Sequence, residues 1–165
     1  MEHKNILIVV ENLIKEHHFH CDWGIEWSEK QHFMELIFQF NLENPDKFLL
    51  TDVMNNQFED KTVPFETKIV FYDDQYMRAE MKHYLKSIPV NQRVGIMYGD
   101  LISVIKYLKI LTSEVPLKWR EFIQNPRLTE FKLEWQDASF VQLRETLLKT
   151  SRFSESAVFF PKNNP

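Results

Sequence analysis

Glycine is scarce in this chain of 165 residues, which contains only Gly24, Gly95 and Gly99. Dinucleotide-binding and phosphate-cradling loops need several glycines close together, because their backbone approaches the phosphate directly. These three glycines cannot build either kind of loop. The sequence also lacks the Gly-x-Ser-x-Gly, His-Glu-x-x-His and paired Cys-x-x-Cys motifs. It therefore carries none of the hydrolase or zinc-site signatures that these motifs represent.

Cysteine and long apolar runs are equally scarce. Cys21 is the single cysteine, so it cannot form an internal disulfide, and a reducing compartment is the expected one. No stretch approaches the roughly 18 consecutive apolar residues of a membrane-spanning helix. The apolar residues 6–10 are too few for the core of a secretory signal, and Glu11 follows them directly. We therefore predict a cytoplasmic protein that does not interact with a membrane.

The composition is that of a soluble globular protein, with 44% hydrophobic and 27% charged residues. A chain of this length can bury a core of its own, so we expect a single domain over residues 1–165. Residues 1–82 carry 16 acidic and 8 basic side chains, a net charge of −8, whereas residues 83–165 carry 8 acidic and 12 basic ones, a net charge of +4. This division favours self-association or an acidic partner, and two differently solvated faces are the simpler alternative.

The clearest structural pattern is a β-hairpin. Apolar and polar residues alternate over residues 19–27 and again over residues 32–42, with a short turn between them. Placing Trp27 opposite His32 puts the apolar side chains of both strands on one face. The reverse face mixes charged and apolar side chains and is a candidate interaction face. It carries Glu26, Phe33, Glu35, Ile37 and Gln39.

Alternation predicts further strands. A third strand covers residues 63–71, and a fifth covers residues 131–135. Residues 76–88 fit a strand that ends at Pro89 and completes a second hairpin, but they also fit a helix. Residues 43–62 form a polar connection in which residues 48–50 could add a short edge strand.

Helical spacing of apolar residues predicts the remaining elements. The predicted helices cover residues 4–17, 99–112, 116–124 and 140–148, with Pro116 in the first turn of the third. The apolar tail at residues 158–161 is expected to dock on the body of the protein. The sequence thus predicts an α+β fold: an antiparallel sheet of four to five strands, built from two hairpins and packed with three to four helices.

Histidine clusters near the start of the first predicted strand. If residues 18–22 are extended, His18, His20 and Asp22 project from the same face. Two imidazoles and a carboxylate suit zinc or iron. Against a metal site, His17 continues the apolar stripe of the first helix and Cys21 points to the opposite, apolar face, so the cluster divides across two sides of the sheet. No cofactor is implied by any other pattern.

A loose basic stretch lies in the second half of the chain. It consists of Lys106, Lys109, Lys118, Arg120, Arg127 and Lys132. Nucleic-acid binding normally requires a denser patch on a positively charged domain, whereas this chain has a net charge of −4. Weak nucleic-acid binding therefore ranks third among the functional hypotheses.

One pattern of aromatic and turn residues extends over nearly the whole chain. It consists of Trp23 and Trp27, Met34-Glu-Leu-Ile-Phe38, Phe65-Glu-Thr-Lys-Ile-Val-Phe-Tyr-Asp73, Tyr84-Leu-Lys-Ser-Ile-Pro89, a helix led by glycine, Phe131-Lys-Leu-Glu-Trp135 and Phe159-Phe-Pro161. This order resembles a family of short uncharacterised proteins, a domain of unknown function, from low-GC Gram-positive bacteria. The resemblance implies a shared fold and carries over no catalytic or binding residue.

The sequence favours a non-catalytic protein-interaction or regulatory module with an unidentified protein partner or with itself. The alternative is a small metal-binding protein or enzyme that uses the face of His18, His20 and Asp22. Both hypotheses remain open from the sequence.

Overall fold

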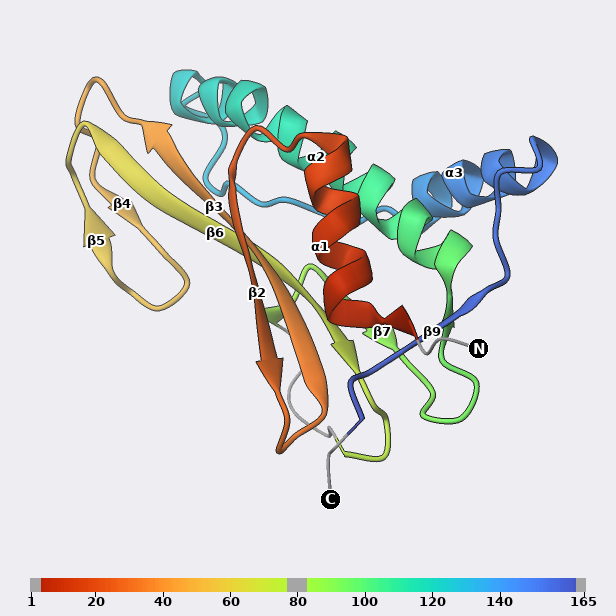
Figure 1. The fold of residues 1–165 in the computed structure, drawn as a ribbon. Coiled ribbons are helices and arrows are strands. Elements are labelled where there is room, and N and C mark those ends of the chain that lie inside the picture. The colour runs from red at the N-terminus through yellow and green to blue at the C-terminus, as the bar shows by residue number, and fades with distance from the viewer. Residues whose placement is uncertain (1–3, 77–82, 163–165) are drawn as a thin grey trace.

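A computed structural model describes residues 4–76 and 83–162 and shows a mixed α+β fold around a four-stranded sheet (Figure 1). The strands lie in the order β2-β3-β6-β7. β2 and β6 run antiparallel to the central β3, whereas β7 runs parallel to β6. The four strands are β2 (Asp22–Ser28), β3 (Phe33–Glu43), β6 (Thr62–Tyr72) and β7 (Lys86–Pro89). The predicted fold class, with a largely antiparallel sheet of four strands, is confirmed.

Three helices are present in the described residues, and α1 and α2 pack on one face of the sheet while α3 packs against α2 (Figure 1). They are α1 (Ile6–His17), α2 (Tyr98–Gln124) and α3 (Asp137–Lys149). α1 begins where the Asn5 side chain accepts the Leu7 N–H at 2.9 Å, which satisfies one of the free donors of the first turn. None of the helices in the described part of the chain is long and apolar enough to cross a membrane.

Two smaller sheets lie outside the main sheet. One brings together strands from near both ends of the chain, and the other is a projecting hairpin. β9 (Ala157–Phe159) lies between β1 (Lys4–Asn5) and β8 (Ile96–Met97). Val158 of β9 is fully buried, so the predicted docking of the tail is confirmed. β4 (Leu50–Thr51) pairs with β5 (Gln57–Phe58) away from the main sheet. We call residues 44–61, which contain β4 and β5, the arm.

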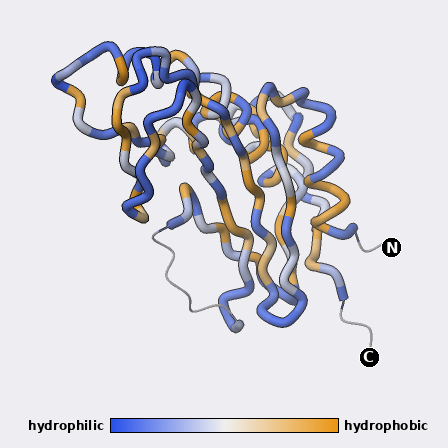
Figure 2. The backbone as a smooth tube through the Cα atoms, turned by 90° about the vertical axis from the view of Figure 1, so that its left-hand side faces the viewer, coloured by the Kyte–Doolittle hydropathy of each residue, from blue (hydrophilic) through white to orange (hydrophobic). Residues whose placement is uncertain are grey.

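Alternation along the long strands separates the core from the outer face of the sheet. Met34, Leu36 and Phe38 of β3 are fully buried against the helices. The residues between them turn to the other face, and Figure 2 shows the corresponding alternation of hydropathy along the strands. The even spacing of apolar residues therefore identified the core-facing side of β3 correctly.

The register of the hairpin differs from the prediction by two residues. Trp27 lies opposite Met34, not His32, and Ser28 lies opposite Phe33. A shift of two leaves every side chain on the same face, so alternation alone cannot detect it. The turn decides the register, because His32 has a left-handed backbone with φ of 51° and ends the loop.

The second hairpin of the prediction is wrong. β7 does end at Pro89, but it runs parallel to β6, which requires a crossover connection and not a tight turn. The predicted strand over residues 76–88 falls partly on residues 77–82, which lie outside the described residues.

Two further predictions are wrong in the second half of the chain. Pro116 does not start a new helix, because α2 continues through it without a break from residue 98 to residue 124. Residues 131–135 alternate between inward and outward side chains but pair with no described strand. Their inward side chains, among them the buried Leu133, pack against the C-terminal half of α2, which contributes Val115 and Trp119 to the same cluster. The alternation here therefore reflects a contact on one side of the segment.

Candidate functional site

The three predicted metal ligands do not lie on one strand. His18 follows α1 as its C-terminal cap, with φ of 50°, and its carbonyl accepts a hydrogen bond from Lys109 Nζ. His20 lies in the bend that follows, and only Asp22 belongs to β2. All three residues are exposed. In residues 4–76 and 83–162 no three His, Cys, Asp or Glu side chains are placed so that they could hold a metal ion. Metal binding by these residues therefore has no geometric support there.

A shallow groove of about 500 Å³ lies beside these residues, between the start of β2, the end of β3 and α2. His20, Cys21 and Asp22 line one side, and Pro116 and Trp119 of α2 line the other. Burial of the Cys21 thiol, with a smaller effect of the Asp22 carboxylate, raises the pKa of Cys21 to about 11. A thiol with this pKa stays protonated at neutral pH and is a poor nucleophile.

The five residues of the predicted interaction face lie on one side of the sheet, the side away from the helices. Glu26 and Gln39 are exposed there, and Phe33 and Ile37 are half-buried. Glu35 is not available to a partner, since the residue is only 9% exposed. Its carboxylate accepts a hydrogen bond from the Tyr84 hydroxyl and lies 3.5 Å from Lys68 Nζ. Glu35 thus holds the chain before β7 to the sheet.

A second groove, of about 480 Å³, lies between α2, α3 and the extended residues 132–136. Tyr107 and Leu111 of α2 and Leu143 of α3 form its apolar part. Ile110 stands beside them and is 45% exposed. Polar side chains surround this part, namely Glu114, Lys118, Lys132, Glu134, Gln136, Ser139, Gln142 and Thr146. We call this surface the α2–α3 groove.

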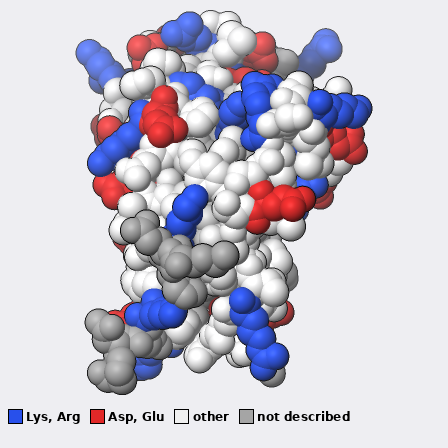
Figure 3. Space-filling view, turned by 45° about the vertical axis from the view of Figure 1, so that its right-hand side comes forward, with Lys and Arg blue, Asp and Glu red and all other residues white. Residues whose placement is uncertain are grey.

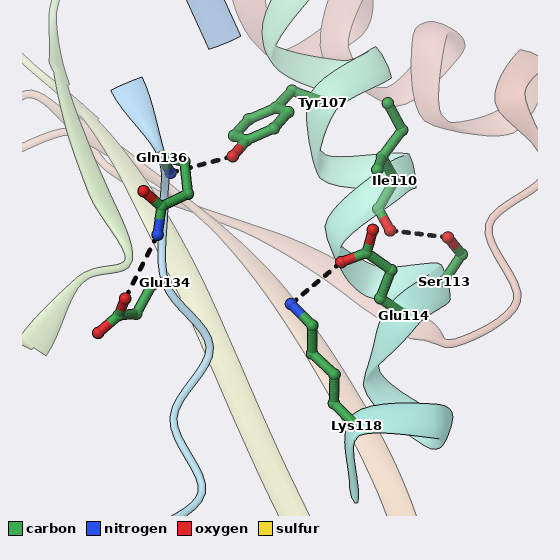
Figure 4. Close-up of polar contacts among 7 residues, drawn as sticks. All are labelled: Tyr107, Ile110, Ser113, Glu114, Lys118, Glu134 and Gln136. Atoms are coloured by element: carbon green, nitrogen blue, oxygen red, sulfur yellow. Dashed lines mark hydrogen bonds and ion pairs between the residues drawn. The ribbon is translucent and has the colours of Figure 1, made fainter. Parts of the chain in front are cut away.

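Hydrogen bonds hold one side of the α2–α3 groove in place (Figure 4). The Gln136 N–H donates to the Tyr107 hydroxyl at 3.0 Å, which joins the extended segment to α2. The Tyr107 ring packs edge-to-face on Trp135, with 4.6 Å between ring centroids. The Gln136 side-chain amide donates to Glu134 at 3.3 Å. The backbone that bears the polar side chains of the groove is therefore fixed by contacts with α2.

The charged side chains of the α2–α3 groove pair with each other. Lys118 Nζ lies 3.1 Å from the Glu114 carboxylate one helical turn before it, as Figure 4 shows. Lys132 Nζ lies 4.0 Å from the Glu134 carboxylate. Exposed pairs of this kind contribute less than about 1 kcal/mol each to stability.

One residue in the sequence, Ile110, could have indicated this groove, but the regular spacing of the buried residues of α2 drew attention away from it. Ile110 lies off the buried stripe of α2, to which Leu108 and Leu111 belong. An apolar residue on the solvent side of a helix marks a surface that another element or partner could cover. The position of α3 beside Ile110 depends on tertiary packing, which cannot be predicted from the spacing of apolar residues along the sequence.

The predicted basic stretch does not form a uniform patch. Lys109 donates to the His18 carbonyl, and Lys118 and Lys132 pair with glutamates. Figure 3 shows positive and negative side chains interspersed on one face of the molecule, around an uncharged middle. This mixture differs from the continuous positive surface of a nucleic-acid-binding domain.

Comparison with known proteins places this α+β fold in a family. Residues 1–162 match the model of the family described as "Protein of unknown function (DUF3013)", and the chain belongs to that family. This confirms the resemblance found in the sequence. No match was found among curated proteins.

A solved structure has the same fold. It is the crystal structure of a conserved protein of unknown function from Enterococcus faecalis, a low-GC Gram-positive bacterium. The two chains superpose with a TM-score of 0.85 at 24% sequence identity, over 98% of each chain. At this identity the likeness concerns the fold alone.

Proposed function

We propose that the protein is a non-catalytic protein-interaction module of the cytoplasm, with a regulatory role, and that the α2–α3 groove is its binding surface. The single observation that carries the proposal is the exposed Ile110 beside an apolar floor and within a ring of polar side chains. Protein interfaces have this organisation, since an apolar centre is enclosed by a polar rim.

The shape of the α2–α3 groove favours a polypeptide partner over a small ligand. Small-molecule sites are enclosed and bury most of the ligand, whereas this groove is open along α2. A side chain docked against Ile110 would cover Tyr107 and Leu143 as well. Backbone amides of a bound chain would meet the amides and hydroxyls of Gln136, Ser139 and Gln142.

A pair of variants tests the proposal. Ile110→Asp places a charge in the α2–α3 groove, and Val141→Asp places the same charge on the opposite side of α3, where Val141 is 47% exposed and lines neither of the two grooves described above. Immobilised wild type, Ile110→Asp and Val141→Asp are exposed to lysate of the organism that produces the protein, and retained proteins are quantified by mass spectrometry.

We expect one or a few proteins to be retained by wild type and by Val141→Asp, and reduced about 10-fold or more by Ile110→Asp, which corresponds to about 1.4 kcal/mol of binding energy. Equal retention by all three proteins would contradict the groove as the binding surface. Circular dichroism of both variants controls for folding.

A further inference from the structure

The two edges of the four-stranded sheet differ in how they are protected. β7, at one edge, has only four residues and ends at Pro89, which has no N–H. Lys86 of β7 also pairs with Asp137 at the start of α3, with 2.9 Å between Nζ and the carboxylate. Short length, proline and lysine are features by which proteins keep a sheet edge from pairing with another chain. The β7 edge is therefore protected against a further strand.

β2, at the other edge, has none of these features (Figure 1). It runs for seven residues without a proline or a lysine. Its register with β3 is continuous, from Asp22 opposite Gln39 to Ser28 opposite Phe33, so no bulge interrupts it. No described strand lies on its outer side. A long, regular edge of this kind can pair with a strand of another chain.

The direction of the backbone groups of β2 follows from the neighbouring strands. The Asp73 N–H donates to the His32 carbonyl at 3.1 Å, one position beyond the pair of Phe33 and Tyr72. Phe33 therefore directs its own N–H and carbonyl away from β6 and toward Ser28, its partner in β2. Every second residue of β2, counted back from Ser28, faces β3 in the same way.

The residues between them direct their N–H and carbonyl groups outward. They are Trp23, Ile25 and Trp27. No hydrogen bond joins these outward groups to another residue of the described ranges. They are a row of donors and acceptors that only an added strand could satisfy together.

The apolar layer of the core also ends at this edge only partly covered. The core-facing side chains of β3 are fully buried, whereas their neighbours in β2, Trp23, Ile25 and Trp27, are half-buried. A strand added beyond β2 would cover these side chains further, and the two indoles offer the largest apolar area.

We propose that β2 pairs antiparallel with β2 of a second copy, so that two sheets of four strands join into one sheet of eight. This inference goes beyond the proposed function, because it concerns the sheet edge and not the α2–α3 groove. A two-fold axis at Ile25 places Ile25 opposite itself and Trp23 opposite Trp27 of the second copy. All three outward residues of each β2 are then paired, and each pair exchanges two hydrogen bonds. An axis at Trp23 or Trp27 would form only one such pair within β2.

β2 is complementary to itself in this register. On the outer face Asp22 lies opposite Ser28 of the second copy, and Glu26 lies opposite Gly24, so no like charges are directly opposite. No atom lies within 4 Å of a Cβ added to Gly24, which leaves room for the glutamate. Asp22 and Glu26 of different copies are diagonal neighbours, roughly 7–8 Å apart, where physiological salt screens much of their repulsion. This match of β2 with its own sequence favours a second copy as the occupant of the edge.

Charges at residue 25 test the proposal, because this residue faces itself across the axis. Ile25→Lys and Ile25→Glu are measured by sedimentation velocity, separately and as an equimolar mixture, from about 1 µM to 1 mM, a range suited to small interfaces. We expect wild type to form a dimer and nothing larger, since a two-fold contact closes on itself. Each variant alone should dimerise about 100-fold more weakly because like charges meet. The mixture should form a 1:1 dimer at least about 10-fold tighter than either variant with itself.

Val141→Lys and Val141→Glu on the exposed side of α3 control for general attraction between opposite charges. Each should dimerise as wild type does, alone or mixed, and circular dichroism checks the folding of all variants. A monomeric wild type over the whole range would overturn the inference, and so would residue-25 variants that dimerise like wild type or a mixture no tighter than its components. Ile110→Asp should leave the dimer unchanged, so this inference and the proposed function fail separately.

Hydrogen exchange of wild type tests the same contact without a variant. We expect the amides of Trp23, Ile25 and Trp27 to exchange more slowly as the protein concentration rises, because the dimer engages their outward N–H groups. Nuclear magnetic resonance follows these amides one by one. Exchange that does not change with concentration while a dimer forms would place the contact elsewhere and overturn the inference.

Discussion

At the scale of residues, two polar side chains determine local structure that the sequence did not indicate. Glu35 alternates with the apolar residues of β3, and that pattern placed it on the predicted interaction face. The structure buries it beneath Tyr84, which comes from a distant part of the chain. A contact between residues so far apart in sequence cannot be derived from periodicity, because periodicity describes only the faces of single elements.

Tyr84→Phe tests the role of this contact. The variant leaves the nearly buried Glu35 carboxylate with Lys68 alone, so we expect the free energy of unfolding to fall by about 1–3 kcal/mol. Urea denaturation followed by circular dichroism measures the change. Tyr76→Phe is the matched control, because the exposed Tyr76 makes a ring contact with His32 and has no hydrogen bond from its hydroxyl among the described residues. A Tyr84→Phe variant as stable as this control would contradict the structural role of Glu35.

The turn at Asp52 predicts a pH dependence. Slight desolvation raises the pKa of Asp52, but hydrogen bonds from Asn56 and Met54 outweigh it and hold the pKa below its ordinary value. The ionised carboxylate therefore orders this turn of the arm fully above about pH 3.9, the ordinary aspartate pKa. This order is lost as the pH falls through the lower value of the folded protein.

Amide resonances of Met54 and Asn56 report this transition directly in NMR spectra recorded between about pH 6 and pH 2, a range that spans the ordinary aspartate pKa. We expect both to titrate together with a midpoint below the ordinary aspartate pKa, and the transition to vanish in Asp52→Asn. A midpoint at or above the ordinary value would show that the hydrogen bonds to Asp52 do not form in solution.

At the scale of elements, the sequence predicted which side of each helix or strand faces the core, but it did not predict which strands lie next to each other. The helices α1 and α3 and the strands β2, β3 and β6 were predicted from their apolar spacing, and the docked tail was predicted from the cost of exposing its apolar residues. The hairpin register, the parallel pairing of β7 and the missing sheet partner of residues 131–135 were not. Each of these depends on which backbone lies next to an element, and side-chain alternation is the same for either neighbour.

Pro116 shows why a local rule can fail. A proline has no N–H for the carbonyl four residues earlier, here that of Thr112, and it usually ends or bends a helix. α2 nevertheless continues, because Val115 and Trp119 on either side of Pro116 are buried in the core and fix the helix there. Tertiary packing outweighs the lost hydrogen bond. In the sequence, only the helical spacing of apolar residues on both sides of Pro116 indicates this packing.

The start of α2 depends on a close approach that requires glycine. A Cβ added to Gly99 would lie 2.5 Å from a ring carbon of Phe153, whose ring stacks with the Arg144 guanidinium at 4.8 Å. Gly99→Ala must displace this ring, so we expect a loss of about 1–3 kcal/mol in the free energy of unfolding.

Gly24→Ala is the matched control for Gly99→Ala. No atom lies within 4 Å of a Cβ added to Gly24, which is in the strand β2. We expect this variant to be unchanged or more stable by up to about 1 kcal/mol, because alanine restricts the unfolded chain. Urea denaturation compares both variants with wild type, and equal midpoints for the two would contradict the close approach at Gly99.

At the scale of the whole molecule, α2 organises both the core and the α2–α3 groove. One side of the helix packs on the sheet and α1, and α3 covers part of the opposite side. α3 is fixed there by the buried Leu147 and by the ion pair between Arg144 and Asp100 at the start of α2. The uncovered part of α2, around Ile110, becomes the groove. The sequence predicted the helices that form this groove, and it could not predict how much of α2 is left open.

Binding at the α2–α3 groove is the central claim, and site-specific photo-crosslinking tests it most directly. A photoreactive phenylalanine analogue replaces Ile110 in one variant and Val141 in the other, both expressed in the organism that produces the protein. After irradiation, mass spectrometry identifies what is attached to each position. We predict a defined polypeptide adduct at residue 110 and none at residue 141. The same adducts at both positions, or none at residue 110, would contradict the claim.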